Sequence, residues 1–264
     1  MSLPFRTATA VVRVSEHEFT AQLPNHWQQG RGVFGGLIFG VLLRAARGFE
    51  ADLTRVARTF SCDVAGPVVV GEARVHVQEL RRGRNQTNLQ LSLSQGAQVL
   101  ASALCTLSTP RGGSAPKYEP APPVEASQFE ASRELPATLI RPECTRNYHY
   151  RSLGPLPREG AKEAIAMGFV REVAGEGELD APALSALLDS WWPGIFAVSE
   201  RPFPVSTISY NAQFMPDHAL PAEEPLFYRA RTLTQHDGYS VEFRELWTRE
   251  RLVALNQQTF AVLG

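Results

Sequence analysis

The chain contains the same pattern twice, and this duplication restricts the folds that it can adopt. In each half, one strongly apolar helical segment precedes a run of segments in which apolar and polar residues alternate. These alternating segments lie at 73–78, 88–93 and 99–108, and again at 226–233, 239–247 and 252–263. Alternation with period two, interrupted by short polar turns such as RRGRN and DG, is typical of antiparallel strands.

The segment between the two halves has the composition of a linker. Residues 109–138 contain six prolines and few large apolar side chains, which is unfavourable for a packed core. We therefore expect an N-terminal half at 1–108, a linker at 109–138 and a C-terminal half at 139–264.

Each half also carries one helix that is predicted to be buried. In the first half, apolar residues recur at helical spacing at Phe34, Leu37, Ile38, Val41, Leu42 and Ala45. Other faces of this helix are apolar too, and a helix that is apolar all round is a buried one. In the second half, the apolar stripe consists of Leu184, Leu187, Leu188 and Trp191. The pattern predicts an α+β fold with two antiparallel sheets, each wrapped around a central helix.

An aspartate interrupts the second helix in the segment LLDSWWP, residues 187–193. A carboxylate is seldom buried without a partner. Pro193 disfavours helical geometry at Trp192, which places Asp189 in the last helical turn. There the helix dipole repels an anion by about 0.3 to 1 kcal/mol. An unfavourable charge at this position makes Asp189 a candidate functional residue.

Composition and motif spacing argue against several classes of function. The formal net charge is −1 and no run rich in Lys and Arg is present, so neither nucleic acid nor an anionic membrane is an expected partner. The three cysteines lack CxxC spacing and the six histidines lack HxxxH or HExxH spacing, so neither a disulfide framework nor a metal site is predicted. The first residues, MSLPFRTATAVVRVSEHEF, contain no apolar core of the signal-peptide type, and no later run reaches the length of a membrane span. We expect a cytoplasmic protein.

The segment GRGVFG at 30–35 matches the dinucleotide fingerprint GxGxxG only formally. No apolar strand precedes it and the later strands form hairpins, so a Rossmann fold is not expected. Gly35 and Gly36, at the start of the first helix, have two interpretations. They let a substrate approach backbone N–H groups at the positive end of the helix, or they allow the helix to pack closely against the sheet.

The last strand places amides among apolar neighbours. One face of this strand carries Ala254, Asn256, Gln258, Phe260 and Val262. The corresponding strand of the first half has Ala103 and Cys105 at these positions. Because the C-terminal half has an amide where the N-terminal half has a small apolar residue, a functional site is indicated in the C-terminal half only. Thr207, in the expected strand PVSTISYNAQFM, is by itself an ordinary β-former.

With these residues the chain resembles the acyl-CoA thioesterase II-like family, whose members carry two hot-dog folds in one polypeptide. The segment GVFGGLIFGVLLRAA is similar to the family's first hot-dog helix. The family's hydrolytic triad is an Asp near the end of the second helix, a Thr or Ser in the next strand and a Gln in the last strand. These positions fall on Asp189, Thr207 and Gln258.

The chain departs from the family pattern after the last-strand glutamine, where Thr259 and Phe260 replace a frequent Glu-Gly pair. The neighbouring Gln257 is a second candidate for the amide, but a shift of one residue turns the side chain to the other sheet face.

The resemblance implies an enzyme that hydrolyses acyl-CoA to free fatty acid and CoA, without a metal or redox cofactor. Asp189 is expected to activate a water as general base, with a pKa raised by its surroundings. Thr207 and Gln258 are expected to hold this water and the carboxylate. Backbone N–H groups at a helix start, with Gly36 the first choice, are expected to stabilise the oxyanion.

Two alternatives to this function remain. A hot-dog hydratase or dehydratase needs a histidine as acid and base, and no histidine lies in the two expected helices. A non-catalytic acyl-CoA-binding module gains nothing from the awkward carboxylate of Asp189. Homo-oligomerisation also stays open, although two hot-dogs in one chain already form the pair that single-domain relatives make by dimerising.

Overall fold

The computed structural model of the protein describes residues 3–114, 116–125, 127–136, 138–139, 141–201, 203–215 and 219–263. The N-terminal elements begin with α1 (Phe5–Ala8), β1 (Val11–Arg13), β2 (Glu18–Leu23), the 3-10 turn η1 (Asn25–Trp27) and the hairpin of β3 (Gln28–Gln29) and β4 (Gly32–Val33). They continue with α2 (Gly35–Phe49), β5 (Val56–Val64), β6 (Gly71–Arg82), β7 (Gln86–Gln95) and β8 (Gln98–Ser108).

The C-terminal elements repeat this order of helix before strands. They begin with α3 (Gln128–Ala131), β9 (Arg133–Glu134), the 3-10 turn η2 (Glu143–Asn147), β10 (Tyr148–Ser152) and β11 (Ile165–Glu172). They continue with α4 (Ala181–Asp189), α5 (Ile195–Val198), β12 (Val205–Phe214), β13 (Leu226–His236), β14 (Tyr239–Trp247) and β15 (Leu252–Val262). Both α3 and β9 fall inside the segment expected to be a linker, and β9 pairs with β10.

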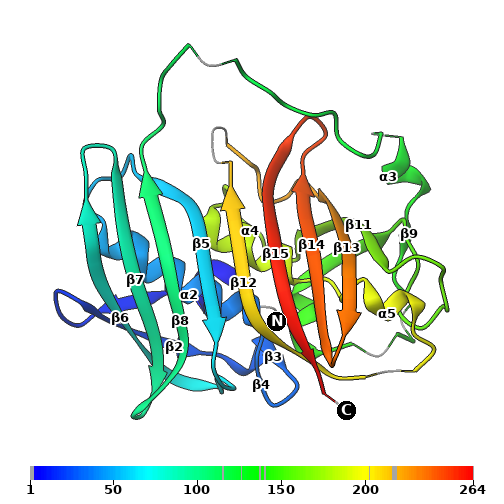
Figure 1. The fold of residues 1–264 in the computed structure, drawn as a ribbon, viewed down its shortest axis with the longest axis horizontal. Helices are drawn as coiled ribbons and strands as arrows, with labels where there is room; N and C mark the ends of the chain where they lie inside the picture. Colours follow the sequence, from blue (N-terminus) through cyan, green and yellow to red (C-terminus); the bar gives the residue numbers. More distant parts are fainter. Residues whose placement is uncertain are drawn as a thin grey trace.

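Apart from the β3–β4 hairpin, the strands form one long antiparallel sheet rather than the two sheets expected from the sequence. Its order is β1-β2-β6-β7-β8-β5-β12-β15-β14-β13-β11-β10-β9, and the two halves lie side by side (Figure 1). They are joined where β5 pairs with β12, with Asn211 opposite Ser61. Unpaired edges expose backbone donors and acceptors. Pairing β5 with β12 removes one such edge from each half, which explains the single sheet.

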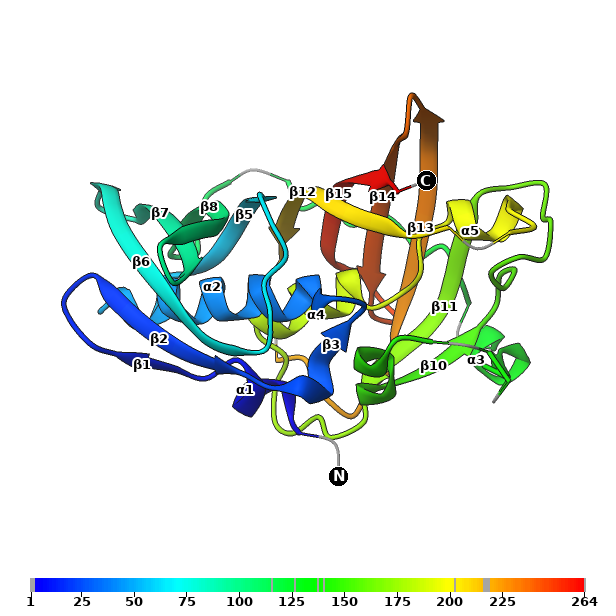
Figure 2. The same ribbon diagram turned by 90° about the horizontal axis from the view of Figure 1, so that it is seen from below.

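The two longer helices lie together on the inner side of this curved sheet. Figure 2 shows α2 and α4 in the middle of the molecule, with strands of both halves around them. They pack so closely that a Cβ on Gly36 of α2 would come within 2.8 Å of the Cα of Ala186 in α4. Buried residues of both helices and both sets of strands belong to one apolar core. Each large apolar side chain in it contributes about 1.5 to 3 kcal/mol of burial free energy.

This arrangement places the end of one helix opposite the start of the other. The C-terminal end of α4, at Asp189, lies against the first turn of α2, because Asp189 accepts a hydrogen bond from the Gly36 backbone N–H. Arg44, in the third turn of α2, forms an ion pair with Asp180, the N-cap of α4. The start of α2 therefore faces the end of α4, whereas the start of α4 is occupied by the Arg44–Asp180 ion pair.

Candidate active site

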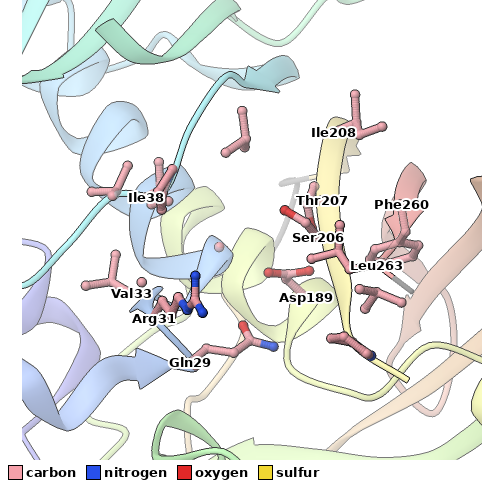
Figure 3. A pocket seen from close by; sticks show the side chains of 18 of the residues that line it. Gln29, Arg31, Val33, Ile38, Asp189, Ser206, Thr207, Ile208, Phe260 and Leu263 are labelled. Carbon is pink, nitrogen blue, oxygen red and sulfur yellow. The ribbon is translucent and has the colours of Figure 1, made fainter. Parts of the chain in front are cut away.

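A cavity of about 670 Å³ lies where the two halves meet, beside the start of α2. Its walls come from the β3–β4 hairpin, α2, the β5–β6 connection, the end of α4, β12, β14 and β15. Most of the lining is apolar and includes Val33, Ile38, Trp191, Ile208 and Phe260. Figure 3 shows the carboxylate of Asp189 and the hydroxyl of Thr207 near one another at this cavity, with Arg31 at another part of its wall.

Asp189 is the last residue of α4 and its side chain is only 7% exposed. The dipole of its own helix disfavours the charge there, as the sequence indicated. The start of α2 compensates, because the Gly36 N–H donates to the carboxylate at the positive end of that helix. The pairing of the two helices thus explains how a carboxylate is accommodated at this position.

The pKa of Asp189 lies above its usual 3.8. Burial is the largest cause and raises the pKa, whereas Arg244, Gln258 and the Gly36 N–H lower it. The direction agrees with the expectation from the sequence, and it brings the carboxyl group closer to the range in which a general base works at neutral pH.

Gln258 connects the other two predicted site residues. Its Nε2 donates to Asp189 Oδ1 at 2.9 Å and to Thr207 Oγ1 at 2.8 Å. The orientation of the amide is fixed by chemistry, because a carboxylate only accepts hydrogen bonds. Gln258 is fully buried, whereas Gln257 is exposed. The three side chains therefore converge, and the amide that joins the other two is that of Gln258 rather than its neighbour.

Thr207 reaches this site because of an irregularity in β12. Tyr210, on the inner face of that strand, lies opposite Gln258, and strict alternation from Tyr210 would turn Thr207 to the outer face. The register shifts between Thr207 and Ser209, so that Thr207 instead lies opposite Phe260. A β-bulge of this kind re-aims side chains and is frequent near active sites.

Two charged residues of β14 belong to the site and were not predicted from the sequence. Arg244 is 1% exposed, and its Nη1 donates to Asp189 Oδ1 at 3.1 Å and to the Leu188 carbonyl at 3.0 Å. Its Nε donates to Glu242 Oε1 at 2.7 Å, and Glu242 is fully buried as well. Glu242 in turn accepts a hydrogen bond from the Gly194 N–H. The sequence pattern that could have indicated them is a pair of opposite charges two residues apart on one strand. It was overlooked because the other face of YSVEFRELW, with Val241 and Phe243, is more apolar and was therefore the expected buried face.

Gly35 and Gly36 have different surroundings. Gly35 lines the cavity, and a Cβ there would come within 2.6 Å of Asp189 Oδ2. Gly36 is enclosed between Phe34 and α4, which agrees with the packing interpretation. Its N–H is already bonded to Asp189, so the donor that we expected to stabilise an oxyanion has another partner.

Histidine and cysteine side chains are absent from the described part of the cavity wall. None of the described histidines lines the cavity. All three cysteines are buried free thiols, and burial raises the pKa of Cys105 and of Cys144 to about 12. Among the described residues, no group of three His, Cys, Asp or Glu side chains could hold a metal ion. No helix of the described chain has the length and apolarity of a membrane span.

Comparison with solved structures identifies the fold. A hot-dog protein of unknown function from Alicyclobacillus acidocaldarius has a TM-score of 0.88 at 21% identity. The TesB protein of Mycobacterium avium subsp. paratuberculosis has a TM-score of 0.81 at 16% identity. The acyl-CoA thioesterase II TesB2 of Mycobacterium marinum has a TM-score of 0.73, also at 16% identity. Each match covers 98% of both chains. At these identities, the likeness shows the hot-dog fold.

Comparison with families covers both halves. A search of curated proteins gives no match. Residues 23–108 match the model of the acyl-CoA thioesterase N-terminal domain, and residues 118–262 match that of the acyl-CoA thioesterase C-terminal domain. The second match alone spans more than half of the chain, so the chain belongs to the acyl-CoA thioesterase family.

Proposed function

We propose that this protein hydrolyses acyl-CoA to free fatty acid and CoA, with a water activated by Asp189. The observation that carries the proposal is the arrangement of the Asp189 carboxylate. Its Oδ1 is held by Gln258 and Arg244, while its Oδ2 lies beside Gly35 at the cavity wall. One oxygen is thereby fixed and the other is positioned to take a proton from a water in the cavity.

Thr207 completes the site for this water. Its Oγ1 accepts from Gln258, so its own hydroxyl hydrogen remains available as a donor. A water between Thr207 and Asp189 Oδ2 can then be oriented by the first and deprotonated by the second. Neither Thr207 nor Gln258 can take a proton at neutral pH, which leaves Asp189 as the base among the three.

The reaction balances with these groups alone. The water oxygen bonds to the thioester carbonyl carbon as Asp189 takes its proton, and a tetrahedral intermediate forms. When the C–S bond breaks, the electron pair goes to the CoA sulfur, which receives the proton from Asp189. The acid product is released and the carboxylate is regenerated.

The cavity suits a substrate with an apolar part and an anionic part. Its apolar lining favours an acyl chain. Arg31, exposed on the β3–β4 hairpin at the cavity wall, has no acidic partner among the described residues. A guanidinium in this position fits a phosphate group of CoA.

The two alternative functions fit these observations less well. A hydratase or dehydratase needs a histidine at the site, and no described histidine lines the cavity. A binding module has no use for a buried carboxylate with a raised pKa, which weakens rather than strengthens the fold. Four expectations stay predictions from the sequence: the absence of a cofactor, the division of the chain at 109–138, a cytoplasmic location and the possibility of homo-oligomers.

The test is a panel of acyl-CoA substrates of different chain lengths, followed by the release of free thiol. We expect turnover with at least one chain length. An acyl-CoA thioether of the best length, which has no carbonyl, serves as the control for binding. A protein that binds the thioether but releases thiol from no acyl-CoA is a binding module, and the thioesterase proposal is then wrong.

A further inference from the structure

The buried guanidinium of Arg244 is fixed on three of its sides. Nε donates to Glu242 Oε1 at 2.7 Å, and Nη1 donates to Asp189 Oδ1 at 3.1 Å and to the Leu188 carbonyl at 3.0 Å. The ring of Phe260 lies under the plane of the group, 5.1 Å from its central carbon. Nη2 makes no hydrogen bond to any described residue, and Arg244 is part of the cavity wall.

A hydrolytic site of the proposed kind requires a donor for the carbonyl oxygen of the thioester. The donors around Asp189 are largely in use. The Gly36 N–H bonds to the Asp189 carboxylate, and Nε2 of Gln258 bonds to both Asp189 and Thr207. Nη2 of Arg244 carries two hydrogens that remain available, next to the carboxylate that would deprotonate the water.

The charges of the site also favour this role. Asp189, Arg244 and Glu242 form a buried group with two carboxylates and one cation. When the water loses its proton to Asp189, the negative charge moves from that carboxylate to the carbonyl oxygen of the substrate. The total buried charge therefore stays constant during the step, and a guanidinium that pairs with both groups can stabilise the negative charge at either position.

We propose that Arg244 is a catalytic residue whose Nη2 donates to the thioester carbonyl oxygen and stabilises the oxyanion. This inference rests on the proposed function. The carbonyl π pair moves onto the oxygen as the water oxygen bonds to carbon, and Nη2 holds the resulting oxyanion. The same pair re-forms the C=O bond when the C–S bond breaks, and the sulfur takes the proton from Asp189. Glu242 is a positioning residue, because it fixes the guanidinium from the opposite side.

Arg244→Lys tests the role with the charge retained. A lysine ammonium can still pair with the buried carboxylates, but it has no second nitrogen in the position of Nη2. We expect kcat to fall by about 10²-fold, the usual loss for one oxyanion donor, with KM little changed. The acid limb of the pH profile should stay in place because Asp189 keeps a cationic neighbour. Arg229→Lys is the matched control, since Arg229 of β13 pairs with Glu245, the residue next to Arg244 in β14, without lining the cavity.

The affinities of two non-hydrolysable substrate analogues test the same contact between Nη2 and the carbonyl oxygen. One is a ketone with CH2 in place of sulfur, and the other is a thioether with CH2 in place of the carbonyl. The wild-type protein should bind the ketone about tenfold more tightly, as expected for one charged hydrogen bond, and Arg244→Lys should lose this preference. If Arg244→Lys does not fold, the double variant Glu242→Gln/Arg244→Gln removes both charges and is measured in its place.

The outcomes separate this inference from the proposed function. An active wild-type protein whose kcat is unchanged in Arg244→Lys shows that another group, such as the Gly35 N–H, polarises the carbonyl, and the inference is overturned. A loss that appears only as a shifted acid limb or a lowered melting temperature makes Arg244 structural, which overturns it as well. A wild-type protein that releases no thiol instead defeats the proposed function itself.

Discussion

Replacing Gly35 with alanine separates the chemistry of the site from the stability of the fold. A Cβ at this position would lie 2.6 Å from Asp189 Oδ2, whereas ordinary contact begins at 3.4 Å. The carboxylate must therefore move by about 0.8 Å, away from the position set by Gln258 and Arg244. A displacement of about 1 Å at a reacting group can reduce the rate by 10²-fold. We expect a loss of kcat of this size.

The fold should tolerate this change. Gly35 is not among the glycines with positive φ, so an alanine can adopt its backbone conformation. Alanine is favoured over glycine in a helix by about 0.5 to 1 kcal/mol, which offsets part of the hydrogen bonding that the displaced carboxylate loses. The net change in the free energy of unfolding is expected to stay below about 2 kcal/mol.

The assay compares thiol release and thermal melting for Gly35→Ala and for Gly48→Ala. Gly48 lies in the last turn of the same helix, outside the cavity, and a Cβ there would approach only the ring of Phe19, at 3.0 Å. The control variant should keep the wild-type kcat. If Gly35→Ala also keeps it, the position of Oδ2 does not matter for catalysis and the reasoning about Asp189 is refuted.

Three further predictions concern pH, substrate recognition and the thiols. The pKa of Asp189 is raised above 3.8, chiefly by burial, so kcat/KM should decline as pH falls through this raised pKa. The effect on stability has the opposite sign. As pH rises through the folded-state pKa of Asp189, its carboxylate becomes charged and destabilises the fold, whereas near and below pH 3.8 this destabilisation vanishes. The Asp189→Asn protein should lack this pH-dependent destabilisation. An Asp189→Asn protein with the wild-type dependence of melting temperature on pH would contradict the assignment. Arg31→Ala should raise KM for acyl-CoA but not for the matching acyl-pantetheine, which lacks the nucleotide phosphates; equal effects on both substrates would exclude phosphate binding by Arg31. Buried cysteines whose pKa is raised to about 12, Cys105 and Cys144, should resist alkylation of the native protein, and stoichiometric inactivation by N-ethylmaleimide would instead indicate a cysteine nucleophile.

The sequence was most informative where a residue conflicts with its local environment. Asp189 was identifiable because a carboxylate at the end of an apolar helix is unfavourable. Gln258 was identifiable because the duplicate strand has a small apolar residue in its place. Both conflicts are local, so they can be read without knowing what lies opposite. The antiparallel pairing and the hot-dog fold were also predicted correctly.

The features that the sequence did not predict depend on contacts between distant segments. The bulge that turns Thr207 inward is set by the register of β12 on β15. The roles of Arg244 and Glu242 depend on which face of β14 is buried, and the alternation alone favours the other face. The union of the two sheets depends on the pairing of β5 with β12. Likewise, the partner of the Gly36 N–H is a residue from the other half of the chain.

The most direct test of the central claim is to measure kcat and the melting temperature of Asp189→Asn together. Asparagine keeps one acceptor oxygen for Gln258 and Arg244 and removes a charge that burial disfavours. We expect a change in stability of no more than about 1 kcal/mol, or about 2 to 4 °C in melting temperature. In contrast, kcat should fall by about 10²- to 10⁴-fold with little change in KM, as for the loss of a general base.

The competing account is that Asp189 serves only as the ion-pair partner of the buried Arg244. That account predicts the reverse result, because removing one member of a buried pair typically destabilises a protein by about 3 to 5 kcal/mol. Thr207→Ala and Gln258→Ala, measured alongside, should each reduce kcat less than Asp189→Asn, since they orient the water and the carboxylate rather than accept the proton. A stable and inactive Asp189→Asn protein is the result that we predict, and a destabilised protein with near-normal turnover is the result that would contradict the account.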